Sequence, residues 1–266
     1  MSVRVIAVDY ANTLPLRSGL KSLEESDALS MSLARPARAT ELFLQGDYDL
    51  GLLPAAARLM AKAANFVGDY GIMSDGFVGS VGVFSEVPFE EIELLYLDHD
   101  SRSSALLTQI LLKHHWKRDE QSDKALRSIV ASPGYRDQLG GTAAGLIIGD
   151  PAIEARAKFP YYYDLAEAWK NMTGLPFVFA AWLASSRLDE SFIKAFDAAQ
   201  AKGVENRVSL AEKYQEFVPG YDLKAYFTSQ IQYRITEEAR KGLHLFLELG
   251  AEILKEQTAR YNEVIG

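Results

Sequence analysis

Short apolar runs alternate with longer amphipathic segments along most of the chain. The runs are rich in Val, Ile, Leu and Ala, a composition typical of buried strands. They cover residues 3–9, 28–34, 49–54, 94–98 and 145–150. Because strands that alternate with helices usually lie parallel to one another, the pattern predicts an α/β fold with mostly parallel strands.

Three amphipathic segments repeat their apolar residues at helical spacing. Residues 37–47 follow a proline and include Gly46, which suits the start and the stop of a helix. Residues 104–115 end in three basic side chains, where positive charge complements the helix dipole. The chain reads as helical from Ser185 onward, and its last amphipathic segment, 236–257, has Thr236 as a candidate cap and an apolar face for packing.

Two long extended runs interrupt the alternation, Phe77–Pro88 and Leu175–Ser186. Two crossings of this kind divide a chain into two lobes joined by a double hinge. The predicted lobes are residues 1–82 plus 182–266, and the inserted residues 83–181. This layout is typical of the two-lobed type II solute-binding, or periplasmic-binding-protein-like, fold, with a ligand cleft between the lobes. A single doubly wound domain is the alternative.

Composition and charge narrow the class of protein. With 266 residues and 48% hydrophobic content the chain can bury a large core, and its lack of cysteine excludes disulfides, thiolate nucleophiles and Cys-bound metals. A formal charge of -8 argues against a nucleic-acid partner. No apolar run reaches the roughly 18 residues of a membrane span, and the first apolar run is too short for a signal peptide, so we expect a cytoplasmic protein without a membrane partner.

The chain lacks the common motifs for nucleotides and metals. It contains no Gly-x-Gly-x-x-Gly, no Walker loop and no His-Glu-x-x-His. Its histidines are His99 in a loop, His114 and His115 at a predicted helix end, and His244 within the last helix. This scatter does not favour a metal cluster. We therefore expect neither a metal nor a cofactor.

Polar loops follow the predicted strands, where open α/β sheets place their ligands. They lie at 9–13, 51–56, 74–76, 98–104 and 149–152. Each residue alone can be a helix cap or a turn. Together the loops supply our candidates for substrate binding, which are Thr13, Ser74, Asp75, Gly76, Ser101, Arg102, Ser103, Ser104 and Asp150.

The densest of these loops is a predicted seat for a carboxylate. Three serines and Arg102 stand at the start of the helix predicted over 104–115. The first N–H groups of a helix point outward without partners, and the helix dipole favours negative charge there. Each charge-assisted hydrogen bond is worth about 1.5–3 kcal/mol. A small organic anion can therefore bind despite the acidic total charge.

In order and spacing, these segments resemble the chorismate dehydratase family of the futalosine route to menaquinone. The resemblance extends from Val5 to about Trp182. It rests on "YANTLPL", "DLGLLPAA", "MSDGFVGSVGVFSEVPFEEI", "LDHDSRSSALLTQILL", "LIIGDPA" and "DLAEAWKNMTGLPFVFAAW". It implies a two-lobed cytoplasmic hydro-lyase that converts chorismate to 3-[(1-carboxyvinyl)oxy]benzoate.

No histidine lies in the shared segments, so a strong base is hard to name. Our hypothesis is that the enolpyruvyl carboxylate of chorismate itself takes the C3 proton. Asn12 and a serine, Ser80 or Ser74, would orient that carboxylate or assist the departing hydroxyl. Asn12 and Ser80 are thus the candidate catalytic residues.

Two alternatives stay open on the sequence. One is 1,4-dihydroxy-6-naphthoate synthase of the same pathway, which usually has a Cys-Pro-Asn-Asp type of first loop that this chain lacks. The other is a non-catalytic small-anion-binding protein of the same fold. The sequence does not indicate the oligomeric state.

Overall fold

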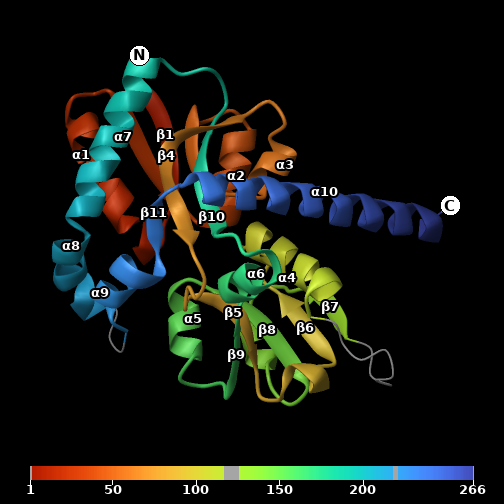
Figure 1. Ribbon diagram of the computed structural model, residues 1–266. Helices are drawn as coiled ribbons and strands as arrows, with labels where there is room; N and C mark the ends of the chain where they lie inside the picture. Colours follow the sequence, from red (N-terminus) through yellow and green to blue (C-terminus); the bar gives the residue numbers. More distant parts are fainter. Residues whose placement is uncertain (1, 117–125, 218–220, 266) are drawn as a thin grey trace.

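The computed structural model describes residues 2–116, 126–217 and 221–265. Two sheets with flanking helices form two lobes (Figure 1). The first sheet has the order β11-β4-β10-β3-β1-β2, from β1 (Val3–Val8), β2 (Leu29–Ala34), β3 (Leu50–Pro54), β4 (Asn65–Ser74), β10 (Phe177–Ala184) and β11 (Gln232–Arg234). The second has the order β7-β6-β8-β5-β9, from β5 (Val81–Ser85), β6 (Leu94–Leu97), β7 (Arg127–Val130), β8 (Ala143–Ile148) and β9 (Tyr161–Asp164).

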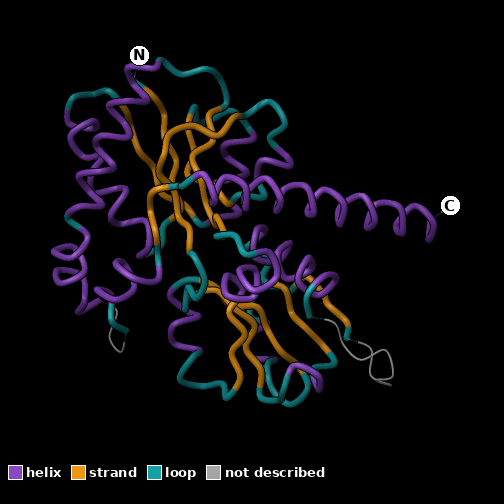
Figure 2. Tube along the Cα trace, in the orientation of Figure 1, coloured by secondary structure: helices purple, strands orange, loops and turns teal. Residues whose placement is uncertain are grey.

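Helices pack around both groups of strands, as the tube in Figure 2 shows. The helices with the first sheet are α1 (Leu14–Glu25), α2 (Pro36–Leu44), α3 (Ala57–Met60), α7 (Glu190–Glu205), α8 (Arg207–Tyr214) and α9 (Leu223–Ala225). Those with the second are α4 (Arg102–His114), α5 (Asp150–Ala155) and α6 (Leu165–Thr173). Short 3-10 turns lie at Ala11–Thr13, Phe89–Glu91, Tyr135–Gln138 and Gln215–Phe217, and a π-helical turn, η5, at Tyr226–Gln230.

The long helix α10 (Glu237–Ile265) contacts both lobes. It packs against β10 and α3 of the first lobe and α4 of the second, where Lys113 pairs with Glu256 at 2.5 Å. Thr236 accepts a hydrogen bond from the N–H of Ala239 at 3.2 Å, which confirms its predicted capping role. In Figure 1 the C-terminal end of α10 extends beyond the two lobes. In the described ranges, no helix is long and apolar enough to cross a membrane.

The predicted α/β class and two-sheet architecture are confirmed, and the strands predicted as parallel, β1, β2 and β3 in the first sheet and β6 and β8 in the second, are parallel to one another. Strands outside that predicted set add antiparallel pairings. Within the sheets β1 pairs with β2 and β3 in parallel, and β6 with β7 and β8. The pairings of β10, β5 and β11 are antiparallel. The reason is topological: β10 re-enters the first lobe from the second, so it runs away from the cleft while β1 and β3 run toward it.

The predicted lobe boundaries fall inside two strands. Boundaries at 82/83 and 181/182 would divide β5 and β10, each of which lies within one sheet. The chain changes sheets between Ser74 and Val81, and again between Asp164 and Phe177. Each predicted extended run therefore covers only the end of a crossing together with the buried strand that follows it, β5 or β10.

Candidate functional site

A cavity between the lobes is walled by both of them. It holds about 560 Å³ not filled by atoms, including its mouth. The loops that form it follow β1, β3 and β8, join β4 to β5, and precede α2 and α4. Its wall consists of Val8, Tyr10, Asn12, Pro36, Pro54, Ile72, Val78, Ser80, Val81, Ser101, Ser103, Ser104, Ile148, Gly149, Phe179, Ala180 and Ile231.

Asn12 reaches this cavity from the 3-10 turn after β1. Its Nδ2 donates to the hydroxyl of Tyr226 at 3.4 Å, while its Oδ1 is buried and has no partner among the described residues. The hydroxyl of Thr13 reaches the carbonyl oxygens of Val8 at 3.0 Å and Tyr10 at 2.8 Å. Thr13 thus lies behind the wall and fixes the loop that presents Asn12.

Ser80 lies in the wall where the chain enters the second lobe. Its hydroxyl and that of Tyr226 are 2.7 Å apart. Its carbonyl accepts a hydrogen bond from Gly149 at 2.8 Å, which joins the β4–β5 crossing to the end of β8. Sequence reasoning missed Tyr226, because it lies in a π-helical turn whose apolar residues have no regular spacing.

The N-terminus of α4 carries the three serines as predicted. Ser103 accepts a hydrogen bond at 2.9 Å from the N–H of Ala56, which belongs to the other lobe. Ser101 precedes the helix but makes no capping bond with its side chain. In the described parts of the chain, the hydroxyls of Ser101 and Ser104 have no protein partner. Two hydroxyls and the free N–H groups of the helix start therefore stand at the cavity.

Arg102, Asp75 and Asp150 lie outside the cavity wall. Arg102 is exposed, and its Nη1 lies 2.7 Å from the sulfur of Met60. The exposed Asp75 pairs with Lys170 at 2.6 Å. Asp150 lines a neighbouring hollow beside Asp9, where burial raises the pKa of its carboxyl.

Ser74 and Gly76 form the turn of the first crossing. The Ser74 hydroxyl donates to the carbonyl of Gly76 at 2.8 Å, and Gly76 has a φ of 106°. Neither residue is part of the cavity wall. Of the predicted residues, the structure brings together Asn12, Ser80, Ser101, Ser103 and Ser104.

The cavity wall is poor in ionisable groups. Its described residues include no Asp, Glu, His, Lys or Arg. Tyr10 is the ionisable member of this set, and burial raises its pKa to about 12, so it is neutral at pH 7. The wall offers hydroxyl and amide groups on an apolar background.

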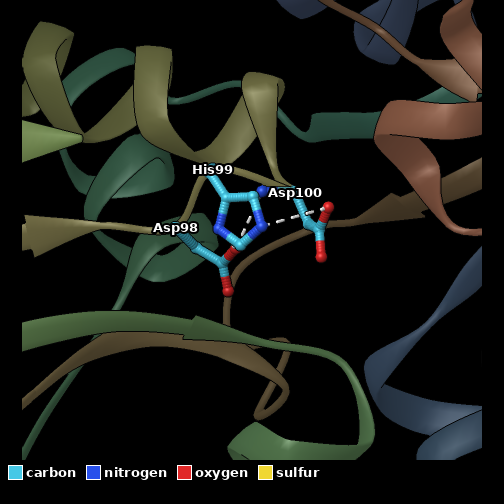
Figure 3. Close-up of side chains that lie close together, drawn as sticks. All are labelled: Asp98, His99 and Asp100. Carbon is cyan, nitrogen blue, oxygen red and sulfur yellow. Dashed lines mark hydrogen bonds and ion pairs between the residues drawn. The ribbon is translucent and has the colours of Figure 1, made fainter. Parts of the chain in front are cut away.

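Asp98, His99 and Asp100 form a compact group just before α4 (Figure 3). Their ligand atoms lie within 4.8 Å of one another, close enough to hold a metal ion. However, the Asp98 carboxylate already accepts hydrogen bonds from Tyr135 at 3.1 Å and from the N–H of Asp100 at 2.9 Å. Arg35, from the other lobe, lies 3.6 Å from Asp100. These contacts tie the group to Tyr135 and to the other lobe.

Comparisons with known proteins agree with this architecture. A family model described as menaquinone biosynthesis matches residues 3–252. Chorismate dehydratase of Thermus thermophilus is 26% identical over 262 residues, covering 90% of this chain and 92% of that protein.

Two solved structures share the fold at low identity. Protein AF1704 of Archaeoglobus fulgidus superposes with a TM-score of 0.71 at 12% identity, covering 94% of this chain and 97% of that one. The alkanesulfonate-binding protein SsuA of Xanthomonas axonopodis pv. citri, bound to MOPS, gives 0.64 at 13% identity, covering 93% of each chain. The fold is therefore the periplasmic-binding-protein-like one, and the match across nearly the whole sequence makes this chain a member of the menaquinone biosynthesis family.

Proposed function

We propose that this protein removes one water from chorismate to give 3-[(1-carboxyvinyl)oxy]benzoate. The observation that carries the proposal is the composition of the cavity wall. Serine hydroxyls, an asparagine amide and a helix N-terminus face a space with apolar sides and, among its described residues, no carboxylate, imidazole or amine. Such a wall suits a dicarboxylate substrate that brings its own base. The similarity to chorismate dehydratase supports the same substrate.

The reaction is an elimination that makes an aromatic ring. A base removes the proton at C3, and the electron pair of that C–H bond enters the ring as the C4–O bond breaks. The hydroxyl leaves with a proton as water. Aromatisation supplies the driving force, so the site has to hold the substrate and stabilise charge as it moves.

The start of α4 is the proposed seat of one carboxylate. Ser101 and Ser104 present hydroxyls that have no partner among the described residues, and the free N–H groups of α4 lie beside them. A carboxylate accepts hydrogen bonds from such donors at about 1.5–3 kcal/mol each. Phe179 and Ile72 supply apolar wall for the ring.

Asn12 suits the C4 hydroxyl better than it suits a carboxylate. Its buried Oδ1 is an unpaired acceptor, and it would repel a carboxylate oxygen but accept a hydrogen bond from a hydroxyl. Because the described wall residues include no carboxylate, imidazole or amine, the enolpyruvyl carboxylate of chorismate is the proposed base for the C3 proton. Ser80 would donate to the departing hydroxyl or to that carboxylate.

The test is to incubate the purified protein with chorismate without added cofactor or metal. We expect a change in ultraviolet absorbance and a product lighter by one water. Chorismate deuterated at C3 should react more slowly if breaking that bond limits the rate. Arg102→Ala is the control variant, because Arg102 points away from the cavity, and it should retain activity.

Two other results would replace the proposal. Binding of chorismate without loss of water would indicate a binding protein of the same fold. Turnover of a cyclic futalosine derivative, with none of chorismate, would indicate 1,4-dihydroxy-6-naphthoate synthase.

A further inference from the structure

Tyr226 joins the two candidate catalytic residues from behind the cavity wall. It begins the π-helical turn η5 and is 1% exposed. Its hydroxyl lies 2.7 Å from the Oγ of Ser80 and accepts a hydrogen bond from the Nδ2 of Asn12 at 3.4 Å. Asn12 follows β1 of the first lobe and Ser80 begins the second, so the tyrosine connects residues that the fold brings from opposite sides of the cleft.

The donor in each hydrogen bond between Asn12, Tyr226 and Ser80 follows from the protons that these side chains carry. An amide nitrogen only donates, so Asn12 occupies an acceptor site on the tyrosine oxygen. The phenol has one proton, and its remaining close partner is the Ser80 Oγ. If the phenol donates to Ser80, the proton of Ser80 is free to point elsewhere. The Ser80 proton can then point into the cavity, because Ser80 is part of the cavity wall.

We propose that Tyr226 is a positioning residue that makes Ser80 a hydrogen-bond donor into the cavity, through the order Asn12 to Tyr226 to Ser80. The proposal rests on the proposed function for the identity of the acceptor, which is the departing hydroxyl or the carboxylate of chorismate. Without the Tyr226 hydroxyl, no contact recorded among the described residues fixes the rotation of the Ser80 hydroxyl. With it, the donor is set before the substrate arrives, so no reorientation is needed as charge develops.

Burial keeps the Tyr226 phenol able to donate a hydrogen bond. The Tyr226 side chain is enclosed, and its burial raises the pKa of the phenol above its ordinary value. The phenol therefore keeps its proton across the range in which the enzyme is assayed. It can act as a donor to Ser80 at every such pH.

The chain supplies a matched control in Tyr233. This tyrosine of β11 is 3% exposed, and its hydroxyl is buried without a partner in the described residues. Tyr233→Phe removes the same atom as Tyr226→Phe from a similar environment. It should leave turnover unchanged.

The first experiment is a double-mutant cycle on chorismate turnover. Removing one preorganised donor typically costs 10²–10³-fold in kcat, so we expect about 10²-fold from Ser80→Ala and about 10-fold from Tyr226→Phe, with KM changing much less. In the Ser80→Ala background, Tyr226→Phe should change kcat by less than about 2-fold, because no Ser80 donor is left to orient. An equal 10-fold loss in both backgrounds would overturn the proposal.

The second experiment does not depend on turnover. Neutron diffraction of the deuterium-exchanged wild-type protein should show the Tyr226 deuteron directed at the Oγ of Ser80. A deuteron of Ser80 directed at Tyr226 instead would overturn the proposal. If the wild type does not dehydrate chorismate, the proposed function fails, and the neutron result alone decides the order of the hydrogen bonds.

Discussion

The carboxylate of Asp164 accepts a hydrogen bond from the N–H of Gly79 at 2.7 Å, which ties the end of β9 to the first chain crossing. The same oxygen accepts from the N–H of Val78 at 3.1 Å and from the Tyr162 hydroxyl at 2.8 Å. The other oxygen caps α6. Because Gly79 directly precedes Ser80, this carboxylate holds the segment that brings Ser80 to the cavity.

Asp164→Ala should therefore destabilise the protein. The side chain is 4% exposed, and its loss leaves several N–H groups without their acceptor. The N–H groups of Val78, Gly79 and Ala166 are in buried hydrogen bonds to Asp164, and each buried group that loses its partner costs about 1–3 kcal/mol. We therefore expect the free energy of unfolding to fall by about 3 kcal/mol or more. Urea denaturation measures it.

Asp75→Ala is the control for Asp164, because it removes an exposed carboxylate whose partner among the described residues is Lys170. A surface ion pair is worth about 0–1 kcal/mol, so the two variants should differ clearly. Equal losses would show that the hydrogen bonds to Asp164 contribute no more than a surface pair does.

Substitutions of the adjacent residues Ser103 and Ser104 should have different effects, the first on protein stability and the second on chorismate binding. Ser103→Ala leaves the N–H of Ala56 without its acceptor in the contact between the lobes, at a cost of about 1–3 kcal/mol. Ser104 has no side-chain partner among the described residues, so Ser104→Ala should leave the melting temperature unchanged and raise KM for chorismate about 10-fold. Calorimetry and steady-state kinetics measure the two effects. A reversal of them would contradict the proposed carboxylate seat.

The sequence predicted β1, β2, β3, β6 and β8 from their runs of apolar residues and missed strands without such a run. β1 is buried along most of its length and β3 along all of it, and both have continuous runs of apolar residues in the sequence. β4 contains Gly68 and Asp69 in its exposed half and showed no such run. The reversed direction of β10 was not predicted either, because strand direction depends on which lobe the chain comes from, and no local spacing records it.

Candidate site residues were predicted where the chain order alone brings them to a strand end. Asn12 follows β1 and the three serines follow β6, so both positions came from the pattern. Arg102 follows the same strand, but its helical position turns it toward Met60. Tyr226 is 146 residues from its partner Ser80 and lies in an irregular turn, so only the three-dimensional structure connects them.

The pH dependence of kcat/KM tests whether the substrate supplies the base. A carboxylate base works only when ionised, so activity should fall as the pH drops below about 5 and stay flat above it, without the step near pH 6.5 that a histidine base gives. Burial raises the pKa of Tyr10 to about 12. Ionised Tyr10 would therefore repel the chorismate dianion, and lower activity, only near that pH.

Asp150→Asn is the control for the acidic limb of that profile. Burial raises the pKa of Asp150, which brings its titration toward the same pH range, although it lies outside the cavity wall. If the substrate carboxylate is the base, the limb should stay in place in this variant. A shift or loss of the limb would assign the titration to the protein instead.

Gly149→Ala should block the cavity. Gly149 has a φ of 66° and belongs to the wall, and a Cβ built there would lie 2.9 Å from the ring of Tyr10. Alanine at a positive φ is strained, by about 1–2 kcal/mol even in the left-handed region, so positive φ needs its own control. Gly134→Ala provides it, because Gly134 has a φ of 86° and no atom within 4 Å of the added Cβ. Gly149→Ala should lose more stability in urea than Gly134→Ala, because Gly149 combines its φ with a ψ of −149°, a region almost restricted to glycine, whereas Gly134 has a ψ of 0° and is left-handed. Only Gly149→Ala, which forces Tyr10 to move, should lower kcat/KM for chorismate, by about 10-fold or more. Equal kinetics in the two variants would show that the Tyr10 side of the cavity does not contact the substrate.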